Sequence, residues 1–177
     1  MLDDWTDGVG RSPQTIFEDL KKGGMGGMGG GGQSKLLGGD PGDVIYPYYL
    51  INGRIPDAPT TFAAKPGQRI RIRFINAGAD TAFRVALAGH TMTVTHTDGF
   101  PVVPTEVDAL LLGMGERYDV IVTVGDGVFP LVALAEGKNA LARALLTTGA
   151  GAAPEPGFRP TELNGRIGTV DMFTATP

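Results

Sequence analysis

Residues 65–76, KPGQRIRIRFIN, carry the clearest structural signal in the sequence. A turn signal at Pro66 and Gly67 is followed by a strict alternation of arginine with isoleucine or phenylalanine. A period of two places alternate side chains on opposite faces of a β-strand. We therefore predict a half-buried strand whose apolar side chains face a core and whose arginines face solvent.

Similar patterns continue on the C-terminal side of this strand. Apolar residues alternate with polar or small ones in 83–87 and 92–97, whereas 118–124 and 129–135 are more continuously apolar, as strands buried on both faces would be. Turn signals separate these runs at intervals of about ten residues. Short strands without helices between them predict an all-β fold, an antiparallel sandwich or barrel.

Composition divides the chain into three zones. Residues 43–149 hold the predicted strands and form the predicted domain. Residues 1–42 predict a loop-like leader, with a short helix over 15–22 that Ser12 caps and Pro13 begins.

Two segments outside the strands have a strongly biased composition. Eight glycines in the ten residues 23–32 predict a flexible Gly/Met-rich loop, because ordering glycine loses much backbone entropy. Residues 150–177 contain four prolines and predict an extended connector without strands.

Overall composition excludes several functions. Lys and Arg number 15 against 19 Asp and Glu, a net charge of −4, which argues against a general binder of nucleic-acid phosphates. The sequence has no cysteine, so this chain cannot form disulfides, a thiolate nucleophile or a blue-copper centre with two histidines and one cysteine. The sequence contains no apolar run of about 18 residues, the length that would predict a membrane span. The acidic start MLDDW is not a signal peptide, so any export signal would lie upstream of this segment.

His90 and His96 are the only two histidines. On one straight strand, six residues at roughly 3.3 Å each would place them on the same face but about 20 Å apart. That separation excludes a shared mononuclear metal site unless the strand folds back between the two histidines. We interpret them as buried or edge imidazoles with hydrogen-bond partners.

Met25 and Met28 lie in the glycine tract. Thioether sulfur is a soft ligand that suits Cu(I), and a glycine chain can wrap around an ion. Two thioethers are few for strong binding. The pair is therefore either a weak Cu(I) site or part of a compositionally biased linker.

The remaining charged residues do not form a convincing catalytic centre. Arg69, Arg71 and Arg73 are interpreted as the solvent face of a strand, screened by neighbouring carboxylates. No local spacing pairs the acidic residues, and the segment around Glu116 fits a strand start with a surface ion pair. A phosphate-binding loop and a serine triad are likewise unsupported. The acidic residues considered are Asp108, Glu116 and Asp119.

Six stretches form a series whose order and spacing are more specific than any one of them. They are YLINGR (49–54), KPGQRIRIRFIN (65–76), FRV (83–85), GHTMTV (89–94), DG (98–99) and DALLLGMGERYDV (108–120). Together they resemble the second, middle cupredoxin-like domain of three-domain multicopper oxidases, the superfamily of laccases and copper-resistance oxidases. The resemblance implies a Greek-key β-sandwich or barrel over 43–149. The Gly/Met-rich insert is most similar to bacterial, periplasmic-type members that handle copper.

The resemblance implies a parent enzyme that oxidises phenols or metal ions such as Cu(I) and reduces O₂ to water. In this family domain three holds the type 1 copper, and eight histidines in four His-x-His pairs hold a trinuclear cluster between domains one and three. This sequence has neither His-x-His nor His-Cys-His, so no copper-ligand position carries over. His90 matches a Gly-His strand position that is not a ligand in the family.

Two functional hypotheses follow. In the first, the chain is the structural middle domain of a periplasmic, cell-envelope or secreted oxidase, inactive alone and without copper or catalytic residues of its own. Its partners are then the flanking domains 1 and 3, with no nucleic acid and no membrane insertion. In the second, it is a non-catalytic β-sandwich binding module or a weak Met-based Cu(I) module. The first hypothesis predicts exposed apolar patches, and the second an evenly polar surface.

Overall fold

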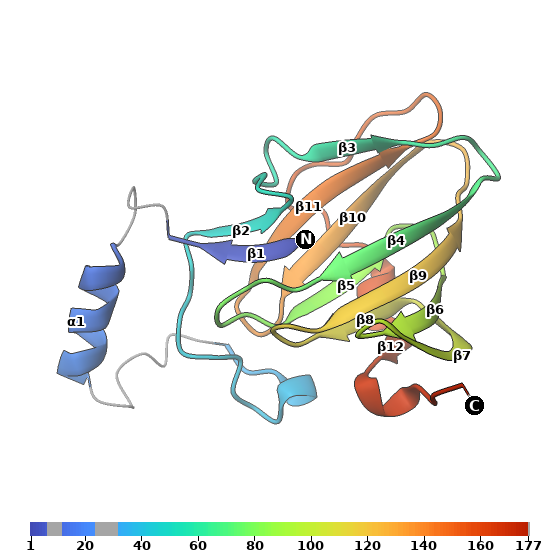
Figure 1. Ribbon diagram of the computed structural model, residues 1–177. Coiled ribbons are helices and arrows are strands. Elements are labelled where there is room, and N and C mark those ends of the chain that lie inside the picture. The colour runs from blue at the N-terminus through green and yellow to red at the C-terminus, as the bar shows by residue number, and fades with distance from the viewer. Residues whose placement is uncertain (7–11, 24–31, 177) are drawn as a thin grey trace.

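Two β-sheets face each other across an apolar core in the computed structural model, which describes residues 1–6, 12–23 and 32–176 (Figure 1). One sheet has six strands in the order β12-β8-β5-β10-β11-β3, and the other has four in the order β4-β9-β6-β7. The chain passes between the sheets after β3, β4, β5, β7, β8 and β9. The strands of the two sheets are β3 (Thr60–Ala63), β4 (Arg69–Ile75), β5 (Phe83–Leu87), β6 (Met92–Thr97), β7 (Phe100–Val107), β8 (Ala109–Leu112), β9 (Arg117–Thr123), β10 (Val128–Ala135), β11 (Ala140–Thr147) and β12 (Ile167–Gly168).

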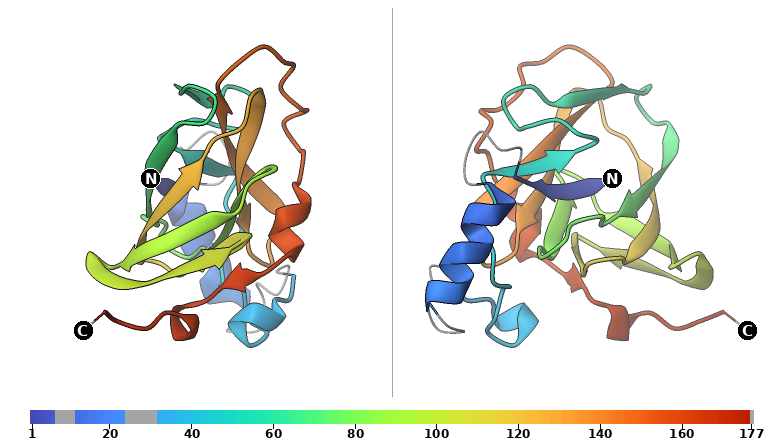
Figure 2. Two further views of the ribbon diagram at one scale, coloured as in Figure 1. Left: turned by 90° about the vertical axis from the view of Figure 1, so that its right-hand side faces the viewer. Right: turned by 60° about the vertical axis from the view of Figure 1, so that its left-hand side comes forward.

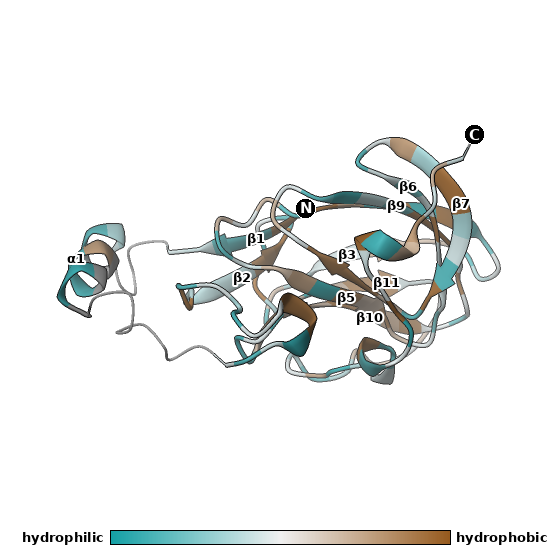
Figure 3. Ribbon diagram, turned by 90° about the horizontal axis from the view of Figure 1, so that it is seen from below, coloured by the Kyte–Doolittle hydropathy of each residue, from teal (hydrophilic) through white to brown (hydrophobic). Residues whose placement is uncertain are grey.

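The alternating pattern of β4 has the predicted consequence. Phe74 is buried and Ile72 is half-buried, while Arg71 and Arg73 are exposed. β10 is buried on both faces from residue 130 onward, also as predicted. The same prediction is wrong for β9, which alternates between buried and more exposed residues because its outer face lies on the solvent side of the four-stranded sheet. β5 and β10, which Figure 3 shows next to each other, are the two central strands of the six-stranded sheet.

The all-β sandwich is confirmed, with two qualifications. The two sheets do not close into a barrel, because β3 and β4 are end strands of different sheets. The pairing is also not wholly antiparallel, since β3 runs parallel to β11 and β12 runs parallel to β8.

The N-terminal zone contains more structure than a loop-like leader. β1 (Leu2–Trp5) pairs antiparallel with β2 (Tyr48–Ile51) in a separate two-stranded sheet, and Leu2 is buried. A strand of four residues is too short to show a period in the sequence, which explains why it was not predicted. The predicted helix is confirmed as α1 (Pro13–Gly23), with the Thr15 N–H donating to Ser12 Oγ at 3.1 Å. Most of the Gly/Met tract, including Met25 and Met28, lies outside the described residues.

The prediction of a strandless connector over 150–177 is wrong. The closely spaced prolines end at Pro160. After it the chain forms a 3-10 helix (Thr161–Asn164), β12 and a second 3-10 turn (Val170–Met172). Residues 174–176 then run beside β7, where the Val103 N–H donates to the Thr174 carbonyl at 2.8 Å. Proline content predicts an extended chain only for the first part of this segment. The apolar residues beyond that part attach the rest to the sandwich.

The sandwich therefore has two different sides, which Figure 2 shows from two directions. On the closed edge, β12 covers β8 and residues 174–176 cover β7. On the open edge, β3 and β4 are the end strands of their sheets, and among the described residues only an isolated parallel bridge between Leu2 and Asn76 touches the end of β4.

Candidate functional site

The two histidines are structural, as interpreted from the sequence. His90 is buried, and its Nδ1 lies 2.7 Å from the Ala88 carbonyl while its Nε2 accepts the Gly125 N–H at 3.0 Å. His96 Nδ1 lies 3.1 Å from Thr95 Oγ1. The assumption of one straight strand is wrong, because His90 belongs to the turn before β6 and a bulge interrupts β6 near His96.

The described residues do not fit a copper centre. Among them, no group of three or more His, Cys, Asp or Glu side chains is placed to hold a metal ion. Both ring nitrogens of His90 already have backbone partners, so its lone pairs are not directed at a common ion. The proposed Met25 and Met28 site lies outside the described residues.

The charged residues on the outer face of the four-stranded sheet behave as a screened surface. Asp119 Oδ2 lies 3.4 Å from Arg71 Nη1 and 3.3 Å from Arg73 Nε, with the guanidinium groups well exposed. Arg117 pairs with Asp98 at 3.4 Å, also in the open. Pairs of this kind contribute little stability, about 0–1 kcal/mol.

Of the other two acidic residues, Glu116 holds a turn and Asp108 attaches the C-terminal segment. Glu116 Oε2 accepts the Gly113 N–H at 2.7 Å, and Asp108 Oδ2 accepts the Arg166 N–H at 2.7 Å. Both carboxylates accept hydrogen bonds from backbone N–H groups.

A buried ammonium group fastens residue 44, which lies just after the N-terminal zone, to the sandwich. The side chain of Lys138 is 0% exposed and follows β10 directly. Its Nζ donates to the Val44 carbonyl at 2.7 Å, the Asp80 carbonyl at 2.6 Å, Asp80 Oδ2 at 2.8 Å and Thr81 Oγ1 at 3.2 Å. A charge without water is tolerated only when it is paired and hydrogen-bonded, so this contact fixes residue 44 against the six-stranded sheet.

A second buried ion pair holds both terminal zones at once. Arg84 Nε lies 2.9 Å from Glu136 Oε2, although the two atoms are not aligned for a hydrogen bond. Ser34 Oγ, from the N-terminal zone, donates to Glu136 Oε1 at 2.6 Å. Arg84 Nη1 donates to the Leu163 carbonyl, from the C-terminal zone, at 3.0 Å. One carboxylate and one guanidinium therefore connect residues 34 and 163 through the centre of the sheet.

Asp4 completes the attachment of β1. It is buried, and its two carboxylate oxygens accept the N–H groups of Ala79 and Asp80 at 2.8 and 3.1 Å. Burial, together with the carboxylates of Asp4 and then Asp80, raises the pKa of Tyr46 to about 12. The phenol therefore stays neutral beside the Lys138 ammonium, which lies 5.8 Å from its ring centroid.

Sequence reasoning missed this polar network. A usable signal was present, because Glu136 and Lys138 directly follow the most continuously apolar run of the chain, and Arg84 interrupts another apolar run. Charged residues inside buried strands need partners. Their partners, Ser34, Asp80 and Leu163, are far away in sequence, so only the fold identifies them.

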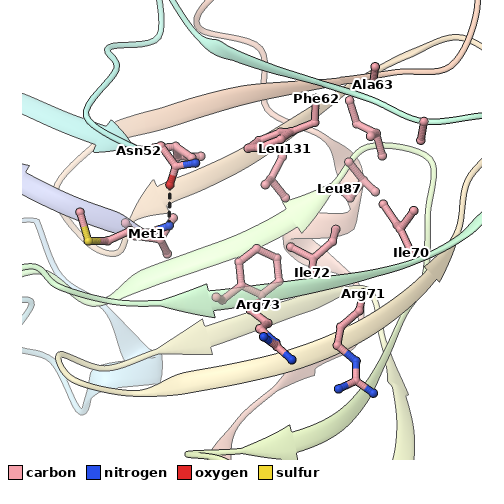
Figure 4. Close-up of a pocket in the computed structure, with 15 residues that line it drawn as sticks. Met1, Asn52, Phe62, Ala63, Ile70, Arg71, Ile72, Arg73, Leu87 and Leu131 are labelled. Carbon is pink, nitrogen blue, oxygen red and sulfur yellow. Dashed lines mark hydrogen bonds between the residues drawn. The ribbon is translucent and has the colours of Figure 1, made fainter.

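The open edge leads to an apolar cavity of about 310 Å³ (Figure 4). Its walls come from both sheets, with Phe62 from β3, Ile70 and Ile72 from β4, and Leu87 and Leu131 behind them. One end is bordered by Met1, whose amino group donates to Asn52 Oδ1 at 2.8 Å. Figure 4 shows the side chains of Arg71 and Arg73 pointing away from this cavity.

Comparison with known proteins agrees with this geometry. The family profile described as multicopper oxidase matches residues 1–151, which is most of the chain. The chain belongs to the multicopper oxidase family. The match includes the N-terminal zone, where β1 and Asp4 join the sandwich, and it extends beyond the six stretches that first suggested the resemblance.

Relatives with copper-related names are similar over part of their length. Multicopper oxidase MmcO of Mycobacterium tuberculosis is 69% identical over 183 aligned residues, covering 99% of this chain and 36% of MmcO. A copper resistance protein A homolog of Pseudomonas syringae pv. tomato is 41% identical over 100 residues, covering 56% of this chain and 17% of that protein. The chain thus spans about a third of the length of MmcO.

Solved structures show the same fold. A mutant laccase from B. aclada superposes with a TM-score of 0.61 at 22% identity, covering 99% of this chain and 31% of the laccase. At this identity the likeness shows the fold alone. The cupredoxin-like β-sandwich expected for this family is confirmed, and multicopper oxidases are the copper-dependent oxidoreductases to which the sequence is related. Among the described residues no helix has the length and apolar character needed to cross a bilayer.

Proposed function

We propose that this chain is the structural middle domain of a three-domain multicopper oxidase. In this organisation residues 43–149 form cupredoxin-like domain 2, residues 1–42 lead from domain 1, and residues 150–177 lead towards domain 3. The observation that carries the proposal is the buried network in which Arg84 and Glu136 connect residue 34 of the leader with residue 163 of the connector. A spacer must fix the segments on both of its sides.

The energetics of the network support a spacing role. Breaking one side of a buried ion pair costs about 3–5 kcal/mol, so the segments attached to Glu136 and Lys138 do not detach independently of the sandwich. Several large apolar side chains are also exposed, notably Phe100 at 73% and Val170 at 61%. Exposed apolar groups of this kind are expected where neighbouring domains pack.

The activity of the longer protein is proposed from the family. It would oxidise phenols or metal ions such as Cu(I) with O₂ as the electron acceptor, with its copper held in domains 1 and 3. The names of MmcO and of the copper resistance protein A homolog support a role in copper handling. We propose a periplasmic, cell-envelope or secreted location for the same reason.

A copper titration of this chain tests the proposal. The chain is mixed with excess Cu(II) under oxidising conditions, separated from free metal, and assayed for bound copper, visible absorption and phenol oxidation. We expect no intense visible band, because a copper–thiolate transition needs a cysteine that the sequence lacks. Stoichiometric copper with phenol turnover would overturn the proposal. The coding sequence on either side gives an independent check, since the proposal requires His-x-His upstream and His-Cys-His downstream.

The alternative, a weak Cu(I) module, has its own test. Cu(I) binding is measured under anaerobic conditions for the original chain and for a variant with Met25→Leu and Met28→Leu. The structural role predicts equal affinity in the two proteins. A loss of binding in the double variant would favour the methionine module.

A further inference from the structure

Among the described residues, the backbone groups on the open side of β4 have no strand partner except at its C-terminal end, where Leu2 bridges Asn76 and the Ala77 N–H donates to the Leu2 carbonyl at 2.8 Å. The Val124 N–H donates to the Gln68 carbonyl at 3.0 Å, and the Asn76 N–H donates to the Glu116 carbonyl at 3.1 Å, one at each end of the β4–β9 ladder. In an antiparallel ladder, successive residues point their N–H and C=O groups to opposite sides. The even-numbered residues of β4 therefore bond to β9, and the odd-numbered ones point towards the open edge.

The two faces of this edge differ in chemistry. On the inner face Ile70 and Ile72 line the 310 Å³ cavity, which is of the size that apolar ligand groups occupy. On the outer face lies the arginine row, which we define as Arg69, Arg71 and Arg73. Asp119 on β9 is the carboxylate that pairs with Arg71 and Arg73, and Glu106 on β7 lines the same outer hollow as Arg69. Three guanidinium groups therefore face two carboxylates, which leaves a positive excess.

We propose that the open edge binds an extended peptide strand in which apolar and acidic residues alternate. The strand would add to β4 through the backbone groups of the odd-numbered residues, which is the β-augmentation mode of recognition. Its apolar side chains would enter the cavity between β3 and β4, and its acidic side chains would lie beside the arginine row. This interaction goes beyond the spacing role proposed above and does not depend on it.

Charge complementarity decides against a second copy of this chain as the occupant. If two β4 strands paired antiparallel with their isoleucines on the same face, arginines would lie opposite arginines. Like charges directly opposite each other destabilise a pair of strands. The arginine row therefore blocks self-pairing of the edge, a known protection of edge strands, and at the same time favours an acidic strand.

A binding experiment with synthetic peptides tests the proposal. The probe is a short fluorescent peptide in which Val and Glu alternate, and its binding to the full chain is measured by anisotropy at low salt. The controls replace Glu with Lys, or Val with Ser. We expect both controls to bind about tenfold more weakly or not at all, because one loses the charge match and the other loses the cavity contacts. Failure of the Val/Glu peptide to bind, or equal binding of the controls, would overturn the proposal.

Backbone pairing is tested separately by N-methylation. In an added strand only alternate peptide N–H groups face β4, so methylating the nitrogens of one residue type abolishes binding and methylating the other type does not. Equal binding of the two methylated peptides would show that the cavity takes apolar groups without strand addition, and the proposal would be wrong.

Matched charge reversals place the site on the protein. Arg71→Glu is expected to weaken binding of the Val/Glu peptide about tenfold and to improve binding of the Val/Lys peptide. Arg166→Glu makes the same change of charge at an exposed residue next to β12, on the closed edge, and should leave both affinities unchanged. An equal effect of the two variants would reduce the interaction to net charge and contradict the proposal. Sedimentation of the unliganded chain as a dimer that Arg71→Glu abolishes would instead identify a second copy as the occupant.

Discussion

The closed and open edges of the sandwich belong to the same two sheets, but only the closed edge is covered by further segments of the chain. At the closed edge β12 and residues 174–176 continue the two sheets, and the 0%-exposed Leu110 and the 1%-exposed Val107 lie beneath them. At the open edge no described strand continues either sheet beyond β3 or β4, apart from the Leu2–Asn76 bridge, and an apolar cavity of about 310 Å³ lies between them. The same two sheets therefore have a filled interior at the edge that a further segment covers and a cavity at the open edge.

The difference lies in how the covering segment is attached. The closed edge depends on residues that come after the last long strand, and Arg84 and Glu136 hold that segment through the Leu163 carbonyl. The open edge has no covering segment of this kind. There the arginine row places positive charge beside the exposed backbone groups of β4, which opposes their pairing with another β4 strand. Four predictions test this comparison.

The largest effect is expected at the buried ion pair behind the closed edge. Glu136→Ala leaves the Arg84 guanidinium without its carboxylate, and we expect a loss of about 3–5 kcal/mol in the free energy of unfolding. Urea denaturation measures the loss. Glu155→Ala removes an exposed carboxylate and serves as the control, with an expected change within about 0.5 kcal/mol. Similar values for the two variants would mean that the network does not hold the segment.

A smaller loss is expected where β12 contacts the core. A Cβ atom added at Gly168 would lie 2.9 Å from Phe173 Cζ, 2.9 Å from Val107 Cγ1 and 3.0 Å from Leu110 Cδ2. Gly168→Ala should therefore cost about 1–3 kcal/mol in the same denaturation experiment. Gly157→Ala adds a Cβ that meets no atom within 4 Å, so a near-neutral result is expected there. If Gly168→Ala were also neutral, the closed edge would not be tightly packed.

Enlarging a side chain should change the free energy of unfolding in opposite directions at the two edges. Ile72→Phe extends a side chain into the open-edge cavity, and we expect a gain of about 0.5–1 kcal/mol. Leu110→Phe enlarges a fully buried side chain at the closed edge and should destabilise by about 1–3 kcal/mol. Thermal unfolding of both variants makes the comparison. Destabilisation by both would show that the cavity at the open edge has no room for a ring.

The smallest effect at neutral pH concerns Tyr118, whose ring packs 5.7 Å from that of Phe173 at the closed edge. Burial, followed by the carboxylates of Glu116 and Asp98, raises the pKa of Tyr118 above the usual tyrosine value. A raised pKa means that the neutral phenol stabilises the fold fully below pH about 10 and that this stability is lost as the pH rises further.

Tyr118→Phe should consequently lose less stability than the original chain between pH 7 and alkaline pH, as measured by urea midpoints. Tyr48→Phe, on the separate two-stranded sheet, is the control for loss of a phenol and should follow the original chain. An identical alkaline loss in the Tyr118 variant would contradict the assignment.

Much of the sandwich was predictable because its strongest signals are local. The alternation in β4, the continuous apolar run of β10 and the Ser12 cap of α1 are each contained within about ten residues, and each gave a correct element. The short strands β1 and β12 carried no such signal, since four and two residues do not reveal a period. They form because Leu2 and Gly168 find complementary partners in distant parts of the chain.

The sequence by itself determined that this chain folds as an all-β sandwich or barrel and that it lacks the thiolate a blue-copper centre requires, because strand periodicity and residue inventory are local properties. Only the tertiary structure decided which edge is covered, where the cavity lies and how Glu136 joins residues 34 and 163. Those contacts connect residues as many as 102 positions apart. Their partners are chosen by packing and by the need to pair buried charges, neither of which leaves a pattern in neighbouring residues.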